Sequence, residues 1–218
     1  MTELRIEGRL GRDGIWAWRS PSFPAGSRPG LLLDRDGVVV EHVPYLHWPA
    51  AVVLLPGAAA LIAAANRCGV AVAVVTNQSG VGRGYYGWRE FGAVMERVQD
   101  LLADQGGAID AVFACPYHRD GRGAFARDDH PGRKPNPGMV LRAAHDLQLD
   151  LARTCLVGDS VADVRAGLSA GVGRVVHVLT GVGGADRAAV AALAAQAGSI
   201  ELADDLGALL ARPLRWPA

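Results

Sequence analysis

The strongest constraint on the fold of this chain is a series of short apolar runs in which polar residues do not alternate with apolar ones. Strands of a sheet with one wetted face alternate, whereas parallel strands buried on both faces read as continuous apolar runs. The runs are 31–33, 70–75, 111–114, 155–157 and 175–179. We therefore predict a parallel sheet whose strands are buried on both faces.

Segments with helical periodicity separate these runs. They span 58–67, 88–104, 138–147 and 161–170, and a helix from Asp186 to Ala197 and a short one after Asp204 complete the chain. Strands that alternate with helices imply right-handed crossovers and helices on both faces of the sheet. The predicted fold class is α/β, a doubly wound, Rossmann-like parallel sheet. In such sheets the chemistry gathers at the carboxyl ends of the strands.

Composition narrows the class of protein. Half of the 218 residues are hydrophobic, which suffices for a large core, and 22 basic side chains are matched by 22 acidic ones. A balanced charge lacks the basic excess of nucleic-acid binders and membrane-surface proteins. The chain starts without a hydrophobic signal region, and its three cysteines are an odd set that fits reduced thiols. We expect a cytoplasmic enzyme for a small molecule, as a monomer or small homo-oligomer, with no nucleic-acid or membrane partner.

The first 29 residues differ from the rest of the chain. They are rich in Arg, Gly, Ser and Pro, a composition typical of turns and loops. We interpret residues 1–29 as an extended arm with no core of its own and residues 30–218 as the catalytic domain. Trp16 and Trp18 are expected to hold the arm on the body by burying ring area, with ligand stacking as the alternative.

Two carboxylates follow the first apolar run directly, in Asp34-Arg35-Asp36-Gly37. On an extended chain Asp34 and Asp36 point to one side and Arg35 to the other. Carboxylates this close repel each other unless a cation lies between them or one takes up a proton. Both solutions suit phosphoryl transfer, because a metal can hold one carboxylate against phosphate while the other serves as general acid. A solvated turn with an Asx cap is the alternative.

The second run ends in Thr76-Asn77-Gln78-Ser79-Gly80. A hydroxyl, two amides and a glycine turn offer neutral donors and backbone N–H groups suited to phosphate oxygens. Thr and Asn are also frequent in ordinary turns, so this segment alone is ambiguous. The glycines from Gly80 to Gly84 lack the spacing of a dinucleotide-binding loop, and no acidic residue follows at the required distance. We exclude a Rossmann cofactor.

Two further charged segments lie at later strand ends. Pro137 suits the first turn of a helix, which leaves Lys134 in the loop before it, where a lysine can neutralise a phosphoryl group. Asp159 follows the fourth apolar run directly, and Asp163 lies four residues later on one face of the next helix. These carboxylates could complete an oxygen shell for Mg²⁺. The alternatives are a solvated loop lysine and a helix cap at Ser160 or Asp159.

Four successive strand ends thus carry Asp-x-Asp, Thr, Lys and Gly-Asp-x-x-x-Asp, in that order. This set resembles the motifs of the haloacid dehalogenase-like (HAD) superfamily over about residues 30–179. The resemblance implies that Asp34 is a nucleophile that becomes an aspartyl-phosphate and that Asp36 is the general acid and base. It also implies that Thr76 and Lys134 hold the phosphoryl group.

The same resemblance implies a magnesium site. The metal would be held by Asp34, the backbone carbonyl of Asp36, and Asp159, with Asp163 in support. An Asp at the second carboxylate position is similar to the phosphatases rather than the ATPases of the superfamily. Only short connections separate the motifs, so we expect an open site and no large cap domain.

Three segments closely resemble one group of phosphatases. Residues 34–38, 76–84 and 133–139 are similar to the D-glycero-D-manno-heptose-1,7-bisphosphate 7-phosphatases and to the related histidinol-phosphate phosphatases. The resemblance implies removal of the 7-phosphate and places Arg133 against the sugar or its distal phosphate. Arg83 is a second substrate-binding candidate, with an exposed loop arginine as the equal alternative, and Asn77 is a third.

One loop departs from that group, which commonly carries a structural zinc bound by Cys-x-His and Cys-x-Cys. Here the first pair reads Cys115-Pro116-Tyr117-His118 and the second reads His130-Pro131-Gly132. Cys115, His118 and His130 could form an altered site, since Cys and His both bind zinc. The shifted spacing leads us to expect a metal-free loop, and it weakens the heptose assignment because this loop borders the expected substrate site.

Three functions are therefore carried forward. The leading one is a Mg²⁺-dependent phosphatase for a sugar phosphate, with heptose 1,7-bisphosphate as the named substrate. The second is a phosphatase for histidinol phosphate or another small metabolite. The third is a catalytically idle phosphate-binding module, against which the complete set of catalytic residue types argues.

Overall fold

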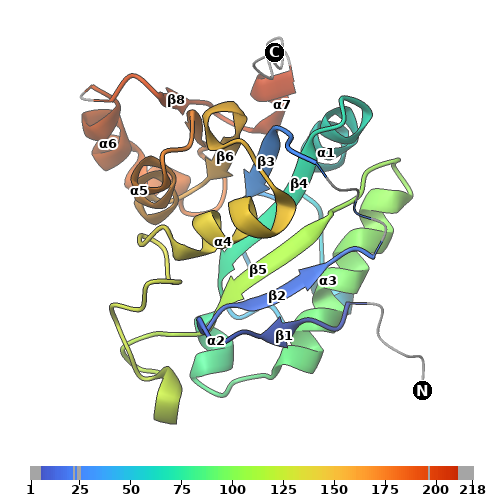
Figure 1. Ribbon diagram of the computed structural model, residues 1–218, viewed down its shortest axis with the longest axis vertical. Helices are drawn as coiled ribbons and strands as arrows, with labels where there is room; N and C mark the ends of the chain where they lie inside the picture. Colours follow the sequence, from blue (N-terminus) through green and yellow to red (C-terminus); the bar gives the residue numbers. More distant parts are fainter. Residues whose placement is uncertain (1–5, 22, 24–25, 196, 211–218) are drawn as a thin grey trace.

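The centre of the molecule is a sheet of eight strands within the described residues, which are 6–21, 23, 26–195 and 197–210 of this computed structural model. The spatial order of the strands is β1-β2-β5-β4-β3-β6-β7-β8 (Figure 1). They span β1 (Arg9–Leu10), β2 (Trp16–Arg19), β3 (Gly30–Leu33), β4 (Ala71–Asn77), β5 (Ala111–Cys115), β6 (Cys155–Gly158), β7 (Arg174–His177) and β8 (Ile200–Leu202). All neighbours from β5 to β8 are parallel, and β1 and β2 are antiparallel additions.

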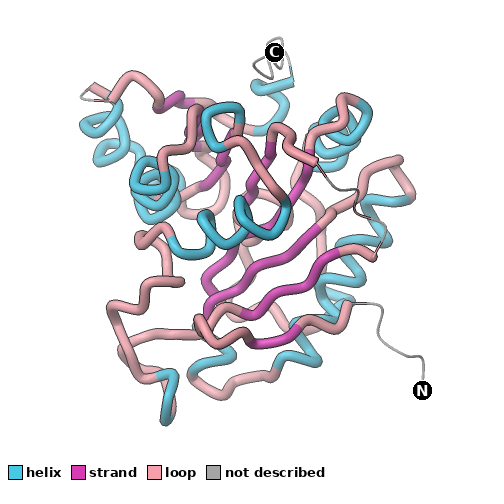
Figure 2. The backbone as a smooth tube through the Cα atoms, in the orientation of Figure 1, coloured by secondary structure: helices cyan, strands magenta, loops and turns pink. Residues whose placement is uncertain are grey.

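Helices cover both faces of this sheet (Figures 1 and 2). On one face lie α1 (Ala58–Arg67), α3 (Trp88–Ala103) and α7 (Leu206–Leu210), and on the other lie α4 (Gly138–Leu147), α5 (Val161–Ala170) and α6 (Gly183–Ala194). The four-residue helix α2 (Ser79–Gly82) follows β4, and short 3-10 turns span Pro49–Ala51, Gly123–Phe125 and Leu151–Arg153. The predicted doubly wound α/β class is confirmed.

The central strand β3 shows why its sequence does not alternate. Leu31 and Leu33 pack into the core on the α1 and α3 side, and Leu32 packs into the core on the α4 and α5 side. All three side chains are at most 1% exposed. Because both faces are covered, every position of the strand favours an apolar residue.

Local signals set the limits of α5, which follows β6. The hydroxyl oxygen of Ser160 accepts a hydrogen bond from the N–H of Asp163, and the carboxylate of Asp163 accepts one from the N–H of Ser160. This reciprocal capping box starts the helix. Gly171 ends it in a left-handed conformation with φ of +79°, which a residue without Cβ adopts readily. The cap fixes Asp163 immediately beside the end of β6.

The N-terminal segment adds an edge to the sheet. Trp16 to Arg19 pair antiparallel with β5, although the sequence predicted only an extended arm there. Trp16 is 2% exposed; its ring stacks on Trp88 with centroids 5.4 Å apart and meets Phe91 edge-on at 5.1 Å. Trp18 is partly buried against the same core. Both tryptophans thus pack against the body, as expected, while residues 1–5, 22, 24 and 25 of the arm lie outside the described residues.

The order of the connections reverses at β3. The chain passes from β3 to β4 on one side and later returns to β6 on the other side of β3. Ligands of doubly wound sheets bind where the order reverses in this way, beyond the carboxyl ends of the strands. Across the described residues, no helix combines the length and apolarity required to cross a membrane.

Candidate active site

The chain turns sharply after β3. The carbonyl oxygen of Arg35 accepts hydrogen bonds from the N–H groups of Val39 and Val40, each at 3.0 Å. Gly37 has φ of +81°, and a Cβ on it would collide with the carboxylate of Asp159. Only glycine therefore fits both the left-handed backbone and the close approach of Asp159. This turn brings the Asp34 to Gly37 segment against the end of β6.

Lys134 joins two of the carboxylates. Its Nζ lies 3.0 Å from Oδ1 of Asp34 and 2.5 Å from Oδ1 of Asp163, and it donates to the carbonyl oxygen of Val75 at 2.9 Å. Lys134 is only 3% exposed. Burial alone would lower the pKa of Lys134, but the charges of Asp163 and Asp34 outweigh it and raise that pKa. The ammonium group therefore stays charged beside Asp34.

Asp34, Asp159 and Asp163 form an acidic cluster. Each offers a carboxylate oxygen, and the three oxygens lie within 4.8 Å of one another. Burial is the main cause that raises the pKa of Asp34 to about 6 and that of Asp159 to about 7. Lys134 opposes the rise at Asp34, and the charge of Asp34 adds to it at Asp159. One ammonium group does not neutralise three carboxylates, and a set of oxygen-only donors suits a hard divalent cation such as Mg²⁺.

Asp163 is the most enclosed member of this cluster. It is fully buried, with Lys134 on one oxygen and the hydroxyl and N–H of Ser160 on the other. The hydroxyl contact is 2.5 Å. Both oxygens thus hold neighbouring protein groups, which places Asp163 as a support for Lys134 as well as a neighbour of the expected metal position.

The side chains of Arg35 and Asp36 do not point to opposite sides, as the alternation of an extended strand predicted. The guanidinium group of Arg35 donates hydrogen bonds to both carboxylate oxygens of Asp36, with distances between 2.8 and 3.1 Å. The prediction that Arg35 faces away from Asp36 was wrong, because β3 ends at Leu33 and the chain has already left the extended conformation. The long arginine side chain can then loop back onto its neighbour.

Two predicted residues lie at the end of β4. Thr76 is 1% exposed, and its Oγ1 accepts a hydrogen bond from Gln78. Asn77 pairs with the backbone of Lys134 at both ends of its amide, donating to the carbonyl at 2.9 Å and accepting from the N–H at 3.1 Å. Asn77 therefore ties the Lys134 loop to β4, while its contact with substrate stays a prediction.

A pocket of about 300 Å³ opens beside Asp36. Its lining includes Asp36, Asn77 and Gln78 from the strand ends, together with His42 and Tyr45 from the loop after β3. The ring of Tyr45 meets that of Tyr85 edge-on with centroids 4.8 Å apart. The pocket is thus shaped by loops that follow β3 and β4, in agreement with a site that has no large cap domain.

Two predicted substrate-binding residues, Arg83 and Arg133, contact the loop that follows β5, and we call this pair the basic wall. Arg83 pairs with Asp120 at 3.1 Å and donates to the ring of His118, and Arg133 donates to the carbonyl of Tyr117 at 2.9 Å. Burial lowers the pKa of Arg133, and the nearby charges of Arg83 and Arg119 add to this effect. The charge of Asp128 opposes this effect at Arg133, and Asp120 pairs with Arg83, so carboxylates already compensate part of this positive charge.

The Cys and His residues of this loop are not gathered into one cluster. Cys115 Sγ lies 4.0 Å from Nδ1 of His130, whereas His118 pairs with Arg83. Among the described residues, the only group of three or more metal-ligating side chains within 4.8 Å is the acidic cluster around Asp34. His130 instead stacks on Tyr117 with ring centroids 3.6 Å apart and planes at 4°.

The loop after β7 belongs to the site, although its sequence was not singled out. The hydroxyl of Thr180 donates to the carbonyl of Gly37, and the N–H of Val182 donates to Oδ2 of Asp159 at 2.8 Å. A Cβ at Gly181 would collide with the Asp159 carboxylate. The available signal was the polar Thr-Gly that follows a fifth apolar run, at the same edge of the sheet.

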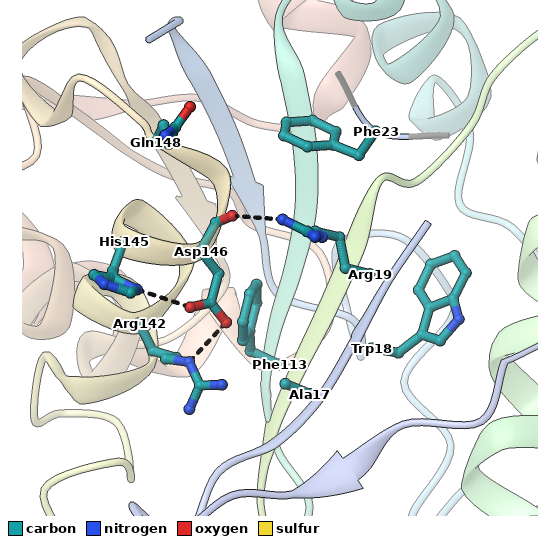
Figure 3. Close-up of a pocket in the computed structure, with 9 residues that line it drawn as sticks. All are labelled: Ala17, Trp18, Arg19, Phe23, Phe113, Arg142, His145, Asp146 and Gln148. Carbon is teal, nitrogen blue, oxygen red and sulfur yellow. Dashed lines mark hydrogen bonds and ion pairs between the residues drawn. The ribbon is translucent and has the colours of Figure 1, made fainter. Parts of the chain in front are cut away.

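A second cavity, of about 600 Å³, lies between β2 and α4 (Figure 3). Ala17 and Phe113 line it from the sheet. Its charged groups are paired with one another: Arg142 and His145 contact the carboxylate of Asp146 at 2.7 and 2.9 Å, and Arg19 donates to the carbonyl of Asp146. This cavity offers a phosphate group less free charge than the strand-end site.

Comparisons with known proteins point to the same site. The HAD-hydrolase-like family model matches residues 132–209. A D-glycero-beta-D-manno-heptose-1,7-bisphosphate 7-phosphatase of Mesorhizobium japonicum is 48% identical over 75% of this chain and 76% of its own length. A D-glycero-alpha-D-manno-heptose-1,7-bisphosphate 7-phosphatase of Burkholderia mallei is 42% identical over 68% of this chain and 78% of its own length.

Solved structures resemble the fold closely. A HAD-like phosphatase of Mesorhizobium loti aligns with a TM-score of 0.75 at 46% identity, over 79% of this chain and 83% of its own. A D,D-heptose 1,7-bisphosphate phosphatase of B. bronchiseptica, complexed with magnesium and phosphate, aligns with a TM-score of 0.69 at 34% identity, over 83% of this chain and 95% of its own. The likeness thus extends over most of the chain.

Proposed function

Because this chain belongs to the haloacid dehalogenase-like phosphatases, in the family of the heptose-1,7-bisphosphate 7-phosphatases, we propose that it hydrolyses a phosphomonoester through an aspartyl-phosphate on Asp34. The observation that carries the proposal is the contact of Lys134 with Asp34, 3.0 Å apart in a buried acidic cluster. A buried carboxylate held by one ammonium group is oriented as a nucleophile and has a cation beside it for the incoming phosphoryl group.

The reaction takes place in two steps. In the first, an oxygen of Asp34 forms a bond to phosphorus, the bond to the sugar oxygen breaks, and that oxygen takes a proton from Asp36. In the second, water gives a proton to Asp36 and attacks phosphorus, which releases inorganic phosphate and regenerates the carboxylate of Asp34. Asp36 acts as general acid and then as general base, which requires that it lie within reach of both oxygens.

Lys134 and Thr76 are proposed to hold the phosphoryl group during both steps. The buried ammonium group of Lys134 would stabilise negative charge that spreads over the phosphoryl oxygens. Thr76 lies at the end of β4, two residues from Gln78 and directly before Asn77, which binds the Lys134 backbone. The two groups are therefore presented by one connected segment of the site.

Asp34 and Asp159, with the backbone carbonyl of Asp36, are proposed to hold Mg²⁺, and Asp163 supports them. The oxygen-only donor set fits this ion. When bound, Mg²⁺ would lower the repulsion between these carboxylates and a phosphate dianion. The B. bronchiseptica relative was solved with magnesium and phosphate, which supports the choice of metal.

For the substrate we propose a sugar bisphosphate, namely heptose 1,7-bisphosphate with loss of the 7-phosphate. The guanidinium carbon of Arg83 lies 6.0 Å from the ring centroid of Tyr45, which lines the pocket next to Asp36. Arg83 and Arg133 are therefore proposed to bind the second phosphate. A phosphate at each end of the substrate would use both the acidic metal cluster and this basic wall. The named activity of the relatives supports the same substrate. Histidinol phosphate lacks a second phosphate, so it is the comparison that tests the role of the basic wall.

The test is hydrolysis of a panel by wild type, Asp34→Asn and a matched control. The panel contains heptose 1,7-bisphosphate, histidinol phosphate and 4-nitrophenyl phosphate. Asp110→Asn is the control, because Asp110 is a half-buried aspartate that binds the N–H of Val72 away from the site. We expect wild type and the control to be active with Mg²⁺ and inactive in excess chelator, and Asp34→Asn to be inactive. Inactivity of wild type on the whole panel would instead support the idle phosphate-binding module.

A further inference from the structure

Three buried polar side chains form a network behind Asp36. Arg35, Gln78 and Tyr86 are 1%, 2% and 9% exposed, and hydrogen bonds link them to Asp36 and Thr76. Nη1 of Arg35 is buried without a hydrogen-bond partner, whereas the contacts of Gln78 and Tyr86 are paired, and such pairing of buried polar groups restricts their geometry. The network therefore defines the positions of the two groups at which it ends.

The orientation of the Gln78 amide follows from its partners. The hydroxyl of Tyr86 donates to Oε1 of Gln78 at 2.6 Å. Burial, opposed by the charge of Arg35, raises the pKa of Tyr86 to about 12, so this hydroxyl keeps its proton at neutral pH. Oxygen and nitrogen of an amide are distinguished by such contacts. Since Oε1 faces Tyr86, Nε2 must face the opposite side.

Nε2 of Gln78 meets one acceptor with each of its two hydrogens. It donates to Oδ2 of Asp36 at 3.2 Å and to Oγ1 of Thr76 at 3.0 Å. Because Thr76 accepts this bond, its own hydroxyl proton is left for another acceptor. At the end of β4, beside Lys134, that acceptor position is where a phosphoryl oxygen is expected.

The carboxylate of Asp36 is fixed from two sides. Arg35 grips both of its oxygens, and Gln78 donates to Oδ2. Proton transfer depends on the distance and angle between the carboxylate and the leaving oxygen, and small misplacements lower the rate strongly. The same glutamine thus acts on the acid that protonates the leaving group and on the hydroxyl that holds the phosphoryl group.

We propose that Gln78 is a positioning residue that orients Asp36 and Thr76 together, and that Tyr86 fixes the direction of the Gln78 amide. This inference rests on the proposed function, because it assigns a geometry to the acid and to the phosphoryl-binding hydroxyl of that reaction. Gln78 acts through its hydrogen bonds to Asp36 and Thr76, and Tyr86 acts through Gln78.

The inference predicts a dependence on the leaving group. An alkoxide leaves only as Asp36 gives it a proton, whereas 4-nitrophenolate is stable and leaves without one. Loss of Gln78 should therefore slow the transfer from an alkyl phosphate much more than the transfer from 4-nitrophenyl phosphate. A residue that only stabilised the fold would affect both substrates alike.

The experiment compares rates of phosphoenzyme formation in single turnovers with Mg²⁺. The aryl probe is 4-nitrophenyl phosphate. The alkyl probe is either heptose 1,7-bisphosphate or histidinol phosphate, whichever reacts faster, since the leaving group of each is an alcohol. Hydrogen bonds to charged groups contribute about 1.5–3 kcal/mol, so Gln78→Leu should lower the alkyl rate about 100-fold and the aryl rate about fivefold. Tyr86→Phe, which keeps the ring, should lower the alkyl rate about fivefold.

Gln99→Leu is the matched control. The amide of Gln99 binds the backbone of Ile109 at 3.3 and 3.0 Å, far along α3 from this network. We expect this variant to melt at a lower temperature with unchanged rates on both probes. Equal losses on the alkyl and aryl probes in Gln78→Leu, or no loss at all, would overturn the inference. A wild type inactive on both probes would overturn the proposed function itself.

Discussion

At the carboxyl ends of β3 and β6, Lys134 lies between Asp34 and Asp163, three charged groups with little contact with water. In β2, next to the outermost strand β1, Trp16 stacks on Trp88 and meets the ring of Phe91 edge-on. Both clusters are buried, but one consists of charges and the other of aromatic rings. They therefore contribute differently to the free energy of folding and to the reaction.

Burial of charges costs desolvation free energy that their mutual attraction only partly offsets. Burial of aromatic rings stabilises the fold through the area removed from water. The comparison shows that Trp16 of β2 contributes stability, whereas the strand ends hold charged groups whose arrangement is unfavourable until a cation or phosphate binds. Single substitutions in each of the two regions should therefore separate loss of activity from loss of stability.

The largest effect is expected for Lys134→Met. Removal of the ammonium group should lower kcat about 1,000-fold or more, because it takes away the charge beside the phosphoryl position. It also leaves the carboxylates of Asp34 and Asp163 unpaired, which should cost about 3–5 kcal/mol of unfolding free energy. Steady-state kinetics with Mg²⁺ and urea unfolding measure the two effects.

Arg142→Met is the control for this change. Arg142 pairs with Asp13 and Asp146 at the surface, where its side chain is 31% exposed. Surface ion pairs contribute about 0–1 kcal/mol, so we expect nearly wild-type stability and kcat. Full activity of Lys134→Met would contradict the claim that the charged strand ends serve the reaction.

Trp16→Ala should show the opposite profile. Loss of a buried Trp typically costs about 3–5 kcal/mol, so the free energy of unfolding should fall by that amount. kcat at a temperature where the variant is folded should change less than twofold, because Trp16 does not contact the acidic cluster. Thermal melts and assays at low temperature test this. A loss of kcat as large as that of Lys134→Met would show that β2 takes part in the chemistry.

The acidic cluster should make the metal-free protein sensitive to pH. Burial raises the pKa of Asp34 to about 6 and of Asp159 to about 7, each from 3.8. Between these values the folded state retains protons that the unfolded chain has released, so stability should fall as pH rises from about 4 to 7. The two shifts together predict a decrease of about 6 kcal/mol in chelator, and saturating Mg²⁺ should remove most of it.

Urea unfolding across this pH range, with chelator or with Mg²⁺, provides the measurement. Trp16→Ala should shift both curves down by a constant amount, since its effect does not involve protons. A metal-free protein whose stability rises over the same range would contradict the raised pKa values of the cluster.

The smallest effect is expected in the loop after β5, where it packs against the turn before β2. Tyr117 stacks on His130 at 3.6 Å, and the turn before β2 packs against both, since a Cβ on Gly14 would meet their rings. The carbonyl of Tyr117 also accepts from Arg133. Tyr117→Leu removes a ring contact of about 1 kcal/mol, so KM for heptose 1,7-bisphosphate should rise about fivefold with kcat unchanged. An equal rise in KM for 4-nitrophenyl phosphate would contradict the proposal that Tyr117 acts on substrate binding through Arg133.

Helix limits and strand ends could be predicted from the sequence because the signals that set them are local. Helices α4 and α5 have the predicted limits, since Pro137 and Ser160 mark their starts and apolar periodicity their length. Parallel strands end at one edge of the sheet, so Asp34, Lys134 and Asp159 were expected near one another, and the structure brings them together. Their catalytic roles stay predictions.

Tertiary contacts decide what the sequence did not reveal. The pairing of Arg35 with Asp36 depends on how the chain turns after β3, and the fit of Thr180 against Gly37 depends on a loop 143 residues away. Strand β2 has only four residues and pairs antiparallel with β5, which periodicity over so short a run does not indicate. The position of β2 depends on the packing of Trp16 against Trp88 and Phe91.

The central claim is that Asp34 carries the phosphoryl group during the reaction. Wild type mixed with labelled substrate and Mg²⁺, then quenched in acid within one turnover, should yield a phosphoprotein that hydroxylamine cleaves. Peptide mass spectrometry should locate the label on the peptide that contains Asp34, and Asp34→Asn should yield none. A label on any other residue, or complete turnover without a labelled protein, would contradict the account.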